Sequence, residues 1–205
     1  MKKYLFLLFI LILGACKPIS TEYLYDINPK YTWGAQVFYG DYYSQYDVIH
    51  NVSSLLLFTE NLSADDDGML NGYGHYLNIP DIFTNISYDV LPDGKYIASE
   101  HSIPFSFRPG KYIGAVGQRY ITGAWVYFIE PNDGKSVRKL ITGGSFTVTW
   151  LRDEFSMTCD FTTDDGKTLK GHIDGYRLPF VDDSSKKADS PSGTNRRMYY
   201  HMEDI

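Results

Sequence analysis

The clearest pattern in this chain is a strict alternation of apolar and polar residues in its last third. The alternation runs from 145 to 150, resumes after a turn at Arg152-Asp153, and resumes again after Asp165-Gly166. Successive side chains of a strand point to opposite faces of a sheet, so this period of two predicts three strands with one face on a core and one in water. Short turns between them predict an antiparallel meander. The inward residues are then Phe146, Val148, Trp150, Phe155, Met157, Cys159, Phe161, Leu169 and Ile173.

Apolar runs farther upstream predict additional strands. The run 54–59 is apolar almost throughout, which is typical of a strand covered on both faces. Pro80 is expected to end the strand before it, and Pro131-Asn132-Asp133-Gly134 is typical of a hairpin turn. In chain order, these strands are predicted at 35–39, 54–59, 73–79, 123–130 and 136–141.

Many short strands, spaced roughly 8–12 residues apart, are typical of a β-sandwich or a β-barrel. The composition agrees, because eighteen tyrosines, twelve phenylalanines, eighteen glycines and nine prolines favour strands and turns over helices. We predict one all-β domain, an antiparallel β-sandwich of jelly-roll type. A lipocalin-like β-barrel is the alternative, because the strand pattern alone does not decide whether the sheet closes.

The N-terminus has a different pattern. A charged head is followed by an apolar run over 4–13 and by small residues, which is typical of a secretory signal and too short to span a bilayer comfortably. The motif Leu13-Gly14-Ala15-Cys16 resembles the lipobox of bacterial lipoproteins. The resemblance implies cleavage before Cys16, a diacylglycerol on its sulfur, and acylation, for example by palmitate, of its new amino group. The alternatives are an ordinary secretory peptide with an incidental cysteine, or a short membrane helix.

The same resemblance also implies a location. In that family, Asp directly after the cysteine is associated with inner-membrane retention, so Lys17 implies the outer membrane, on either its periplasmic or its cell-surface face. The C-terminal half is similar to exported all-β bacterial lipoproteins in three short motifs that carry no known chemistry. These are Gly143-Gly144-Ser145-Phe146-Thr147-Val148, Asp165-Gly166-Lys167 and Gly171-His172-Ile173-Asp174-Gly175.

The predicted organisation follows from these patterns. Residues 1–15 form the signal peptide, 16–32 the lipidated cysteine and a tether, and 33–180 the all-β domain. Within the tether, Tyr23 to Ile27 are alternatively a first edge strand. Residues 181–205 are rich in Ser, Lys, Asp and Asn, which predicts a disordered tail.

The net charge limits the classes of binding partner, and the cysteine count limits the possible disulfides. The net charge is −6, and loss of Lys2 and Lys3 with the signal makes it −8, so no basic surface for nucleic acid is expected. Once Cys16 is lipidated, Cys159 is the remaining cysteine, which excludes an intramolecular disulfide. The domain must therefore be stabilised by its core.

No familiar catalytic or metal-binding spacing occurs. The segment Ser63–Gly68 partly matches a calcium loop but has Ser63 and Gly74 at its first and twelfth positions, where carboxylates are required. The five histidines are scattered, without a zinc-site spacing. Cys159 is expected to be a buried small apolar residue rather than a nucleophile. We therefore predict no catalytic residue, no metal and no cofactor.

One stretch is a candidate for binding. The segment 39–46 places four tyrosines (Tyr39, Tyr42, Tyr43 and Tyr46) in a predicted loop, where exposed rings stack on sugars and hydroxyls bond to them. The alternative is that these rings cover one end of the core. The sequence thus predicts a membrane-anchored, non-enzymatic binding or accessory module for a glycan or an envelope protein. The alternatives are a structural subunit of an envelope complex, a hydrolase or a lipocalin-like carrier.

Overall fold

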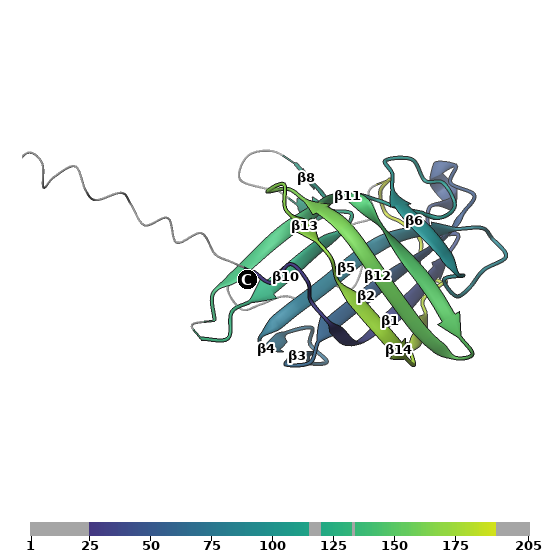
Figure 1. The fold of residues 1–205 in the computed structure, drawn as a ribbon. Coiled ribbons are helices and arrows are strands. Elements are labelled where there is room, and N and C mark those ends of the chain that lie inside the picture. Colours follow the sequence, from purple (N-terminus) through teal and green to yellow (C-terminus); the bar gives the residue numbers. More distant parts are fainter. Residues whose placement is uncertain (1–24, 115–119, 133, 192–205) are drawn as a thin grey trace, which may run out of the picture.

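The computed structural model describes residues 25–114, 120–132 and 134–191, and its regular structure is almost entirely β-strand (Figure 1). Within these residues the helical structure is one 3-10 turn, η1 (Ser44–Tyr46). The all-β prediction is therefore confirmed. The strands are β1 (Tyr31–Gly40), β2 (Asn51–Thr59), β3 (Leu62–Ala64), β4 (Leu70–Gly72), β5 (Gly74–Thr84), β6 (Gly94–Ala98), β7 (Ser106–Phe107), β8 (Lys111–Ile113), β9 (Tyr120–Thr122), β10 (Trp125–Ile129), β11 (Ser136–Leu151), β12 (Glu154–Thr163), β13 (Thr168–Leu169), β14 (His172–Tyr176) and β15 (Phe180–Asp182).

Eleven of these strands form one sheet that contains a closed ring. The main path is β13-β12-β11-β6-β7-β5-β2-β1-β15, and β10 pairs with both β11 and β5. Residues 136–140 of β11 pair with β10, whereas residues 145–148 pair with β6. Strands β5, β7, β6, β11 and β10 therefore close into a small barrel. The jelly-roll sandwich that the strand spacing predicted is not confirmed.

The two ends of the larger sheet also approach each other, as Figure 1 shows for β1 and β14. The amide of Lys170 donates to the carbonyl of Ile27 (2.7 Å), and the amide of His172 donates to that of Pro29 (3.1 Å). The chain before β1 thus lies along the chain before β14. Part of the predicted tether, from residue 25 on, is built into the folded body.

The interior of the body is an aromatic core, and the predicted meander supplies much of it. β11, β12 and β14 are paired in sequence, and every second residue of β12 is buried. Phe146 of β11 stacks on Tyr96 of β6 with ring centroids 4.7 Å apart, and Phe107 and Phe161 pack around it. The inward set predicted from the alternation is confirmed, with Trp150 half-buried at the end of β11.

One predicted boundary is wrong. Pro80 does not end its strand, because β5 continues through it to Thr84. Proline has no amide to donate and is tolerated within sheets at irregular positions. The pairing of β5 with β2 shifts register at this point, between Ser53 and Leu55, and the hydroxyl of Ser54 donates to the carbonyl of Pro80 at 2.7 Å.

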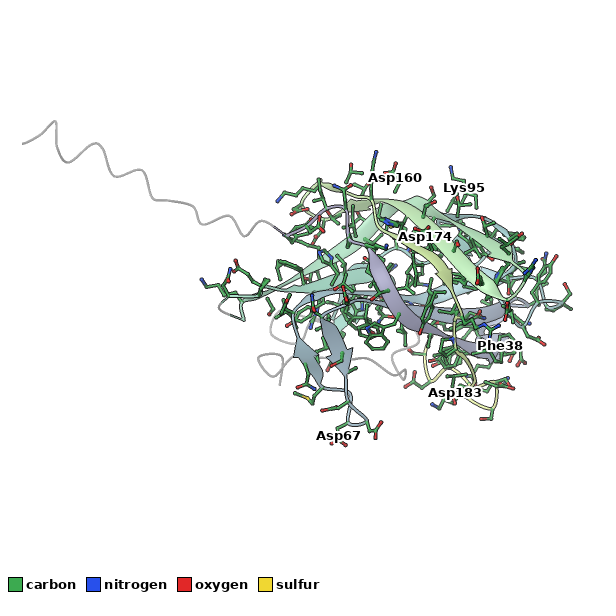
Figure 2. All side chains as sticks on the ribbon, turned by 60° about the horizontal axis from the view of Figure 1, so that its bottom comes forward. Phe38, Asp67, Lys95, Asp160, Asp174 and Asp183 are labelled. Carbon is green, nitrogen blue, oxygen red and sulfur yellow. The ribbon has the colours of Figure 1, made fainter. Side chains whose placement is uncertain are left out.

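A second cluster of buried side chains covers the outer face of β1, β2, β5 and β10. The segment 180–191 helps to cover it, which differs from the predicted disordered tail. β15 pairs in parallel with β1, and the amide of Asp183 donates to the carbonyl of Phe38 at 2.8 Å (Figure 2). Ala188 is buried within the cluster and bonds to the backbone of Tyr42. Residues 192–205 of the predicted tail lie outside the described residues.

Candidate functional site

A pocket of about 280 Å³ opens where the start of β5 meets the ends of β2 and β10 and the chain before β1. This is the end of the body that carries the β3–β4 hairpin in Figure 1, and the hairpin tip at Asp67 points away from the sheet in Figure 2. The pocket is lined by Asp26, Lys30, Thr32, Thr59, Glu60, Asn61, Tyr73, Gly74, His75 and Phe128.

Gly74 sets the close approach of strands at the base of the pocket. Its φ is +125°, and a Cβ at this position would lie 2.1 Å from the hydroxyl oxygen of Thr59. Only glycine leaves room for that hydroxyl, which accepts a hydrogen bond from the amide of His75 at 2.9 Å. The Gly74-His75 start of β5 thus fixes the imidazole between β2 and β10, opposite Phe128 in the β5–β10 register.

His75 is the most unusual residue of the pocket, because it is 1% exposed and yet neither ring nitrogen bonds to any described residue. Its ring packs against Phe128 (centroids 4.7 Å apart) and faces Tyr25 at 6.5 Å. Burial lowers the pKa of His75 to about 4, against a weaker opposing effect of the Asp26 carboxylate. At neutral pH it is therefore an uncharged imidazole with one donor and one acceptor.

An unpaired buried polar group costs about 1–3 kcal/mol, so the native state retains one only where something compensates. Thr32 adds a second example, because its buried hydroxyl also lacks a partner among the described residues. Two unsatisfied hydrogen-bonding groups in one pocket make it a candidate site, because water or a bound molecule is needed to supply their partners.

The rim of the pocket carries charges of both signs. Asp26, Glu60 and Lys30 are exposed there, together with the amide of Asn61 and the ring of Tyr73, which is 41% exposed. None of these residues was singled out for binding from the sequence. They come from three separate stretches of chain, and no spacing in the sequence signals that the fold brings them together.

Tyr25 holds the N-terminal side of the pocket in place. Its hydroxyl lies 3.2 Å from that of Thr163 and donates to the carboxylate of Asp165, and the ammonium of Lys167 lies 5.1 Å from the centre of its ring. Lys139 pairs with the same carboxylate at 3.1 Å. The described residues that lead into β1, from Tyr25 on, are therefore fixed beside His75.

The four tyrosines of the predicted binding loop lie elsewhere, under the segment 180–191. Tyr39, Tyr42 and Tyr43 are buried, and Tyr46 is half-buried against the same cluster. Tyr43 donates to the buried carboxylate of Asp81 at 2.9 Å, and Arg108 lies over its ring. The exposure that sugar stacking requires is absent from the first three, and the structure gives these rings the alternative role of covering the core.

Two other candidate sites have structural roles. The thiol of Cys159 is buried and accepts a hydrogen bond from the amide of Gly171 at 3.1 Å, and burial raises its pKa to about 12. The carboxylate of Asp65 accepts the amides of Asp67 and Met69, which closes the β3–β4 turn. Within the described ranges, no three His, Cys, Asp or Glu side chains gather in a way suited to a metal ion.

Comparisons with protein-family models, with curated proteins and with solved structures found no match. No helix within the described residues has the length and apolar character that a bilayer crossing requires.

The pKa of His75 makes stability depend on pH. Between about pH 6.5 and pH 4 the unfolded chain protonates this imidazole and the folded chain does not, so the free energy of unfolding falls as the pH falls through this window. At about 1.4 kcal/mol per pKa unit, the loss is on the order of 3 kcal/mol. Urea unfolding at pH 7, 5.5 and 4.5 measures it.

A matched pair of variants tests whether His75 causes this pH dependence of the free energy of unfolding. His75→Phe replaces the imidazole by a larger apolar ring without nitrogens, so it should flatten the slope. His101→Phe, at an exposed position, should keep the slope. Equal slopes in wild type and His75→Phe would contradict the assignment.

Proposed function

We propose that this protein is an exported, lipid-anchored binding module of the outer membrane that holds a small polyhydroxylated ligand, such as one sugar residue of a glycan, in the His75 pocket. The observation that carries the proposal is the buried, uncharged imidazole with two unpaired nitrogens in a pocket lined by polar and aromatic side chains. The lipobox at Cys16 supports the anchor.

The lining suits a sugar. A sugar hydroxyl donates and accepts hydrogen bonds, and neutral His75 and Thr32 do the same. Asp26, Glu60 and Asn61 add acceptors at the rim. Tyr73 and Phe128 supply the apolar surface that such sites combine with a few polar groups. The volume is at the lower limit of ligand pockets, about 300–1,000 Å³, which favours one ring over a longer chain.

Catalysis is the second candidate, because the lining also places Asp26 and Glu60 in one pocket with His75. We rank binding first. A general base works best with a pKa near the operating pH, whereas burial lowers that of His75 to about 4. Its ring nitrogens bond to no carboxylate or hydroxyl of the described chain, so the base and its orienting group are not assembled. A carrier with an apolar interior is disfavoured because large aromatic side chains fill the core.

A glycan array probed with the purified full-length protein tests the proposal. Wild type and His101→Phe are expected to bind the same glycans. His75→Phe and Thr32→Val, which each remove hydrogen bonds worth about 0.5–1.5 kcal/mol, should weaken that binding roughly threefold to tenfold. Binding that is unchanged in both pocket variants, or no binding by a folded sample, would overturn the proposal.

A further inference from the structure

The described part of the chain begins at the mouth of the pocket. Asp26 and Lys30 line the pocket, and Tyr25 faces the imidazole of His75. The hydrogen bonds of Ile27 and Pro29 to residues 170–172 fix this segment to the sheet. Any anchor upstream of residue 25 is therefore connected to the body at the pocket end. The opposite end, where β2 begins and β5 stops, is far from this connection.

The link to that anchor is short. From Cys16 to Tyr25 there are nine residue steps (25 minus 16), which span at most about 32 Å when fully extended. Strand β5 has eleven residues and runs away from the pocket for about 33 Å at its usual rise. An anchor at Cys16 therefore keeps the pocket end within about 32 Å of the bilayer.

The side chains around the mouth suit a membrane surface. Ile27 and Tyr73 are 42% and 41% exposed at this end, and apolar and tyrosine side chains favour the headgroup region, where one part of the ring is dry and the other wet. The nearby charges, Asp26, Glu60 and Lys30, are of both signs, so neither a strongly anionic nor a strongly cationic surface is selected. A neutral glycosylated headgroup suits both the exposed Ile27 and Tyr73 side chains and the mixed charges at the mouth.

We infer that the ligand of the His75 pocket is borne by the membrane in which the protein is anchored: the sugar headgroup of a glycosylated lipid, bound in preference to the same sugar free in solution. This inference rests on the proposed function. It adds that anchoring raises the effective concentration of the headgroup at the pocket, with no new contact required.

Hydrogen–deuterium exchange of the lipidated full-length protein in nanodiscs tests the inference. One sample contains phosphatidylcholine with a monoglucosyl diacylglycerol, a second contains phosphatidylcholine alone, and a third adds free methyl glucoside to plain nanodiscs at the same overall concentration. The glycolipid is expected to slow exchange in 26–32 and 73–76 at concentrations at least about tenfold below those required of the free sugar. The far loops 47–50 and 85–90 should not change.

The outcomes separate the inference from the proposed function. Equal protection by glycolipid and free sugar overturns the membrane-borne source and leaves a sugar pocket. Protection by neither overturns both for glucosyl ligands, and protection that persists in His75→Phe overturns the pocket. Protection by glycolipid alone, lost in His75→Phe and kept in His101→Phe, supports the inference.

Discussion

Replacement of Cys16 by alanine is expected to abolish incorporation of a clickable fatty acid, whereas Cys159→Ala should leave incorporation intact. The motif Leu13-Gly14-Ala15-Cys16 places one cysteine at the lipobox position, and the chain has two cysteines in all. The second, Cys159, is buried and its pKa is raised to about 12, so the thiol is not available for acylation. Metabolic labelling followed by in-gel fluorescence measures the difference.

Loss of the lipid at Cys16 should affect membrane attachment as strongly as it affects labelling. Several acyl chains, each contributing about 0.8 kcal/mol per buried methylene, hold a protein on a bilayer far more firmly than one chain can. Residues 17–205 exported behind an ordinary secretory signal should therefore be recovered in the soluble fraction. Equal labelling of wild type and Cys16→Ala, or membrane sedimentation of this non-lipidated form with a folded body, would contradict the anchor.

Phe146→Ala should destabilise the body more than any exposed substitution on the same strand. Phe146 is 1% exposed, stacks on Tyr96 at an interplanar angle of 3°, and lies at the point where β11 pairs with β6 and β12 at once. Truncating a buried phenylalanine removes its transfer free energy and leaves a cavity, which together cost about 3–5 kcal/mol. Urea unfolding monitored by tryptophan fluorescence measures the loss.

The neighbouring position provides the control. Thr147 is exposed on the other face of β11, and Thr147→Ala should change the free energy of unfolding by no more than about 0.5 kcal/mol. A Phe146→Ala midpoint within error of that of Thr147→Ala would show that the closed β5–β10–β11–β6–β7 ring does not enclose the main core.

The parts of the fold that the sequence predicted are those governed by local alternation. Phe155, Met157, Cys159 and Phe161 face the core because a period of two has only one way to bury its apolar set. Ring closure was not predictable in this way, because it depends on β11 pairing with β10 through one half and with β6 through the other. The hydrophobic pattern identifies a strand but does not determine which other strands pair with it.

The tyrosine loop and the pocket illustrate the same limit for function. Exposed rings at Tyr39, Tyr42 and Tyr43 are expected from the sequence because nothing in it indicates that β1 and β2 are covered on their outer face by 180–191. His75 is one of five scattered histidines, and it becomes unusual only once the fold buries it without a partner. In both cases burial, which is a tertiary property, decides the role of the side chain.

The central claim is that the ligand binds at His75, and nuclear magnetic resonance of the histidine rings tests it most directly. In a titration with a panel of methyl glycosides, the ring resonances of His75 should shift for at least one sugar, while those of exposed His101 stay in place. Shifts confined to the residues of 39–46, with His75 unchanged at saturating sugar, would contradict the account.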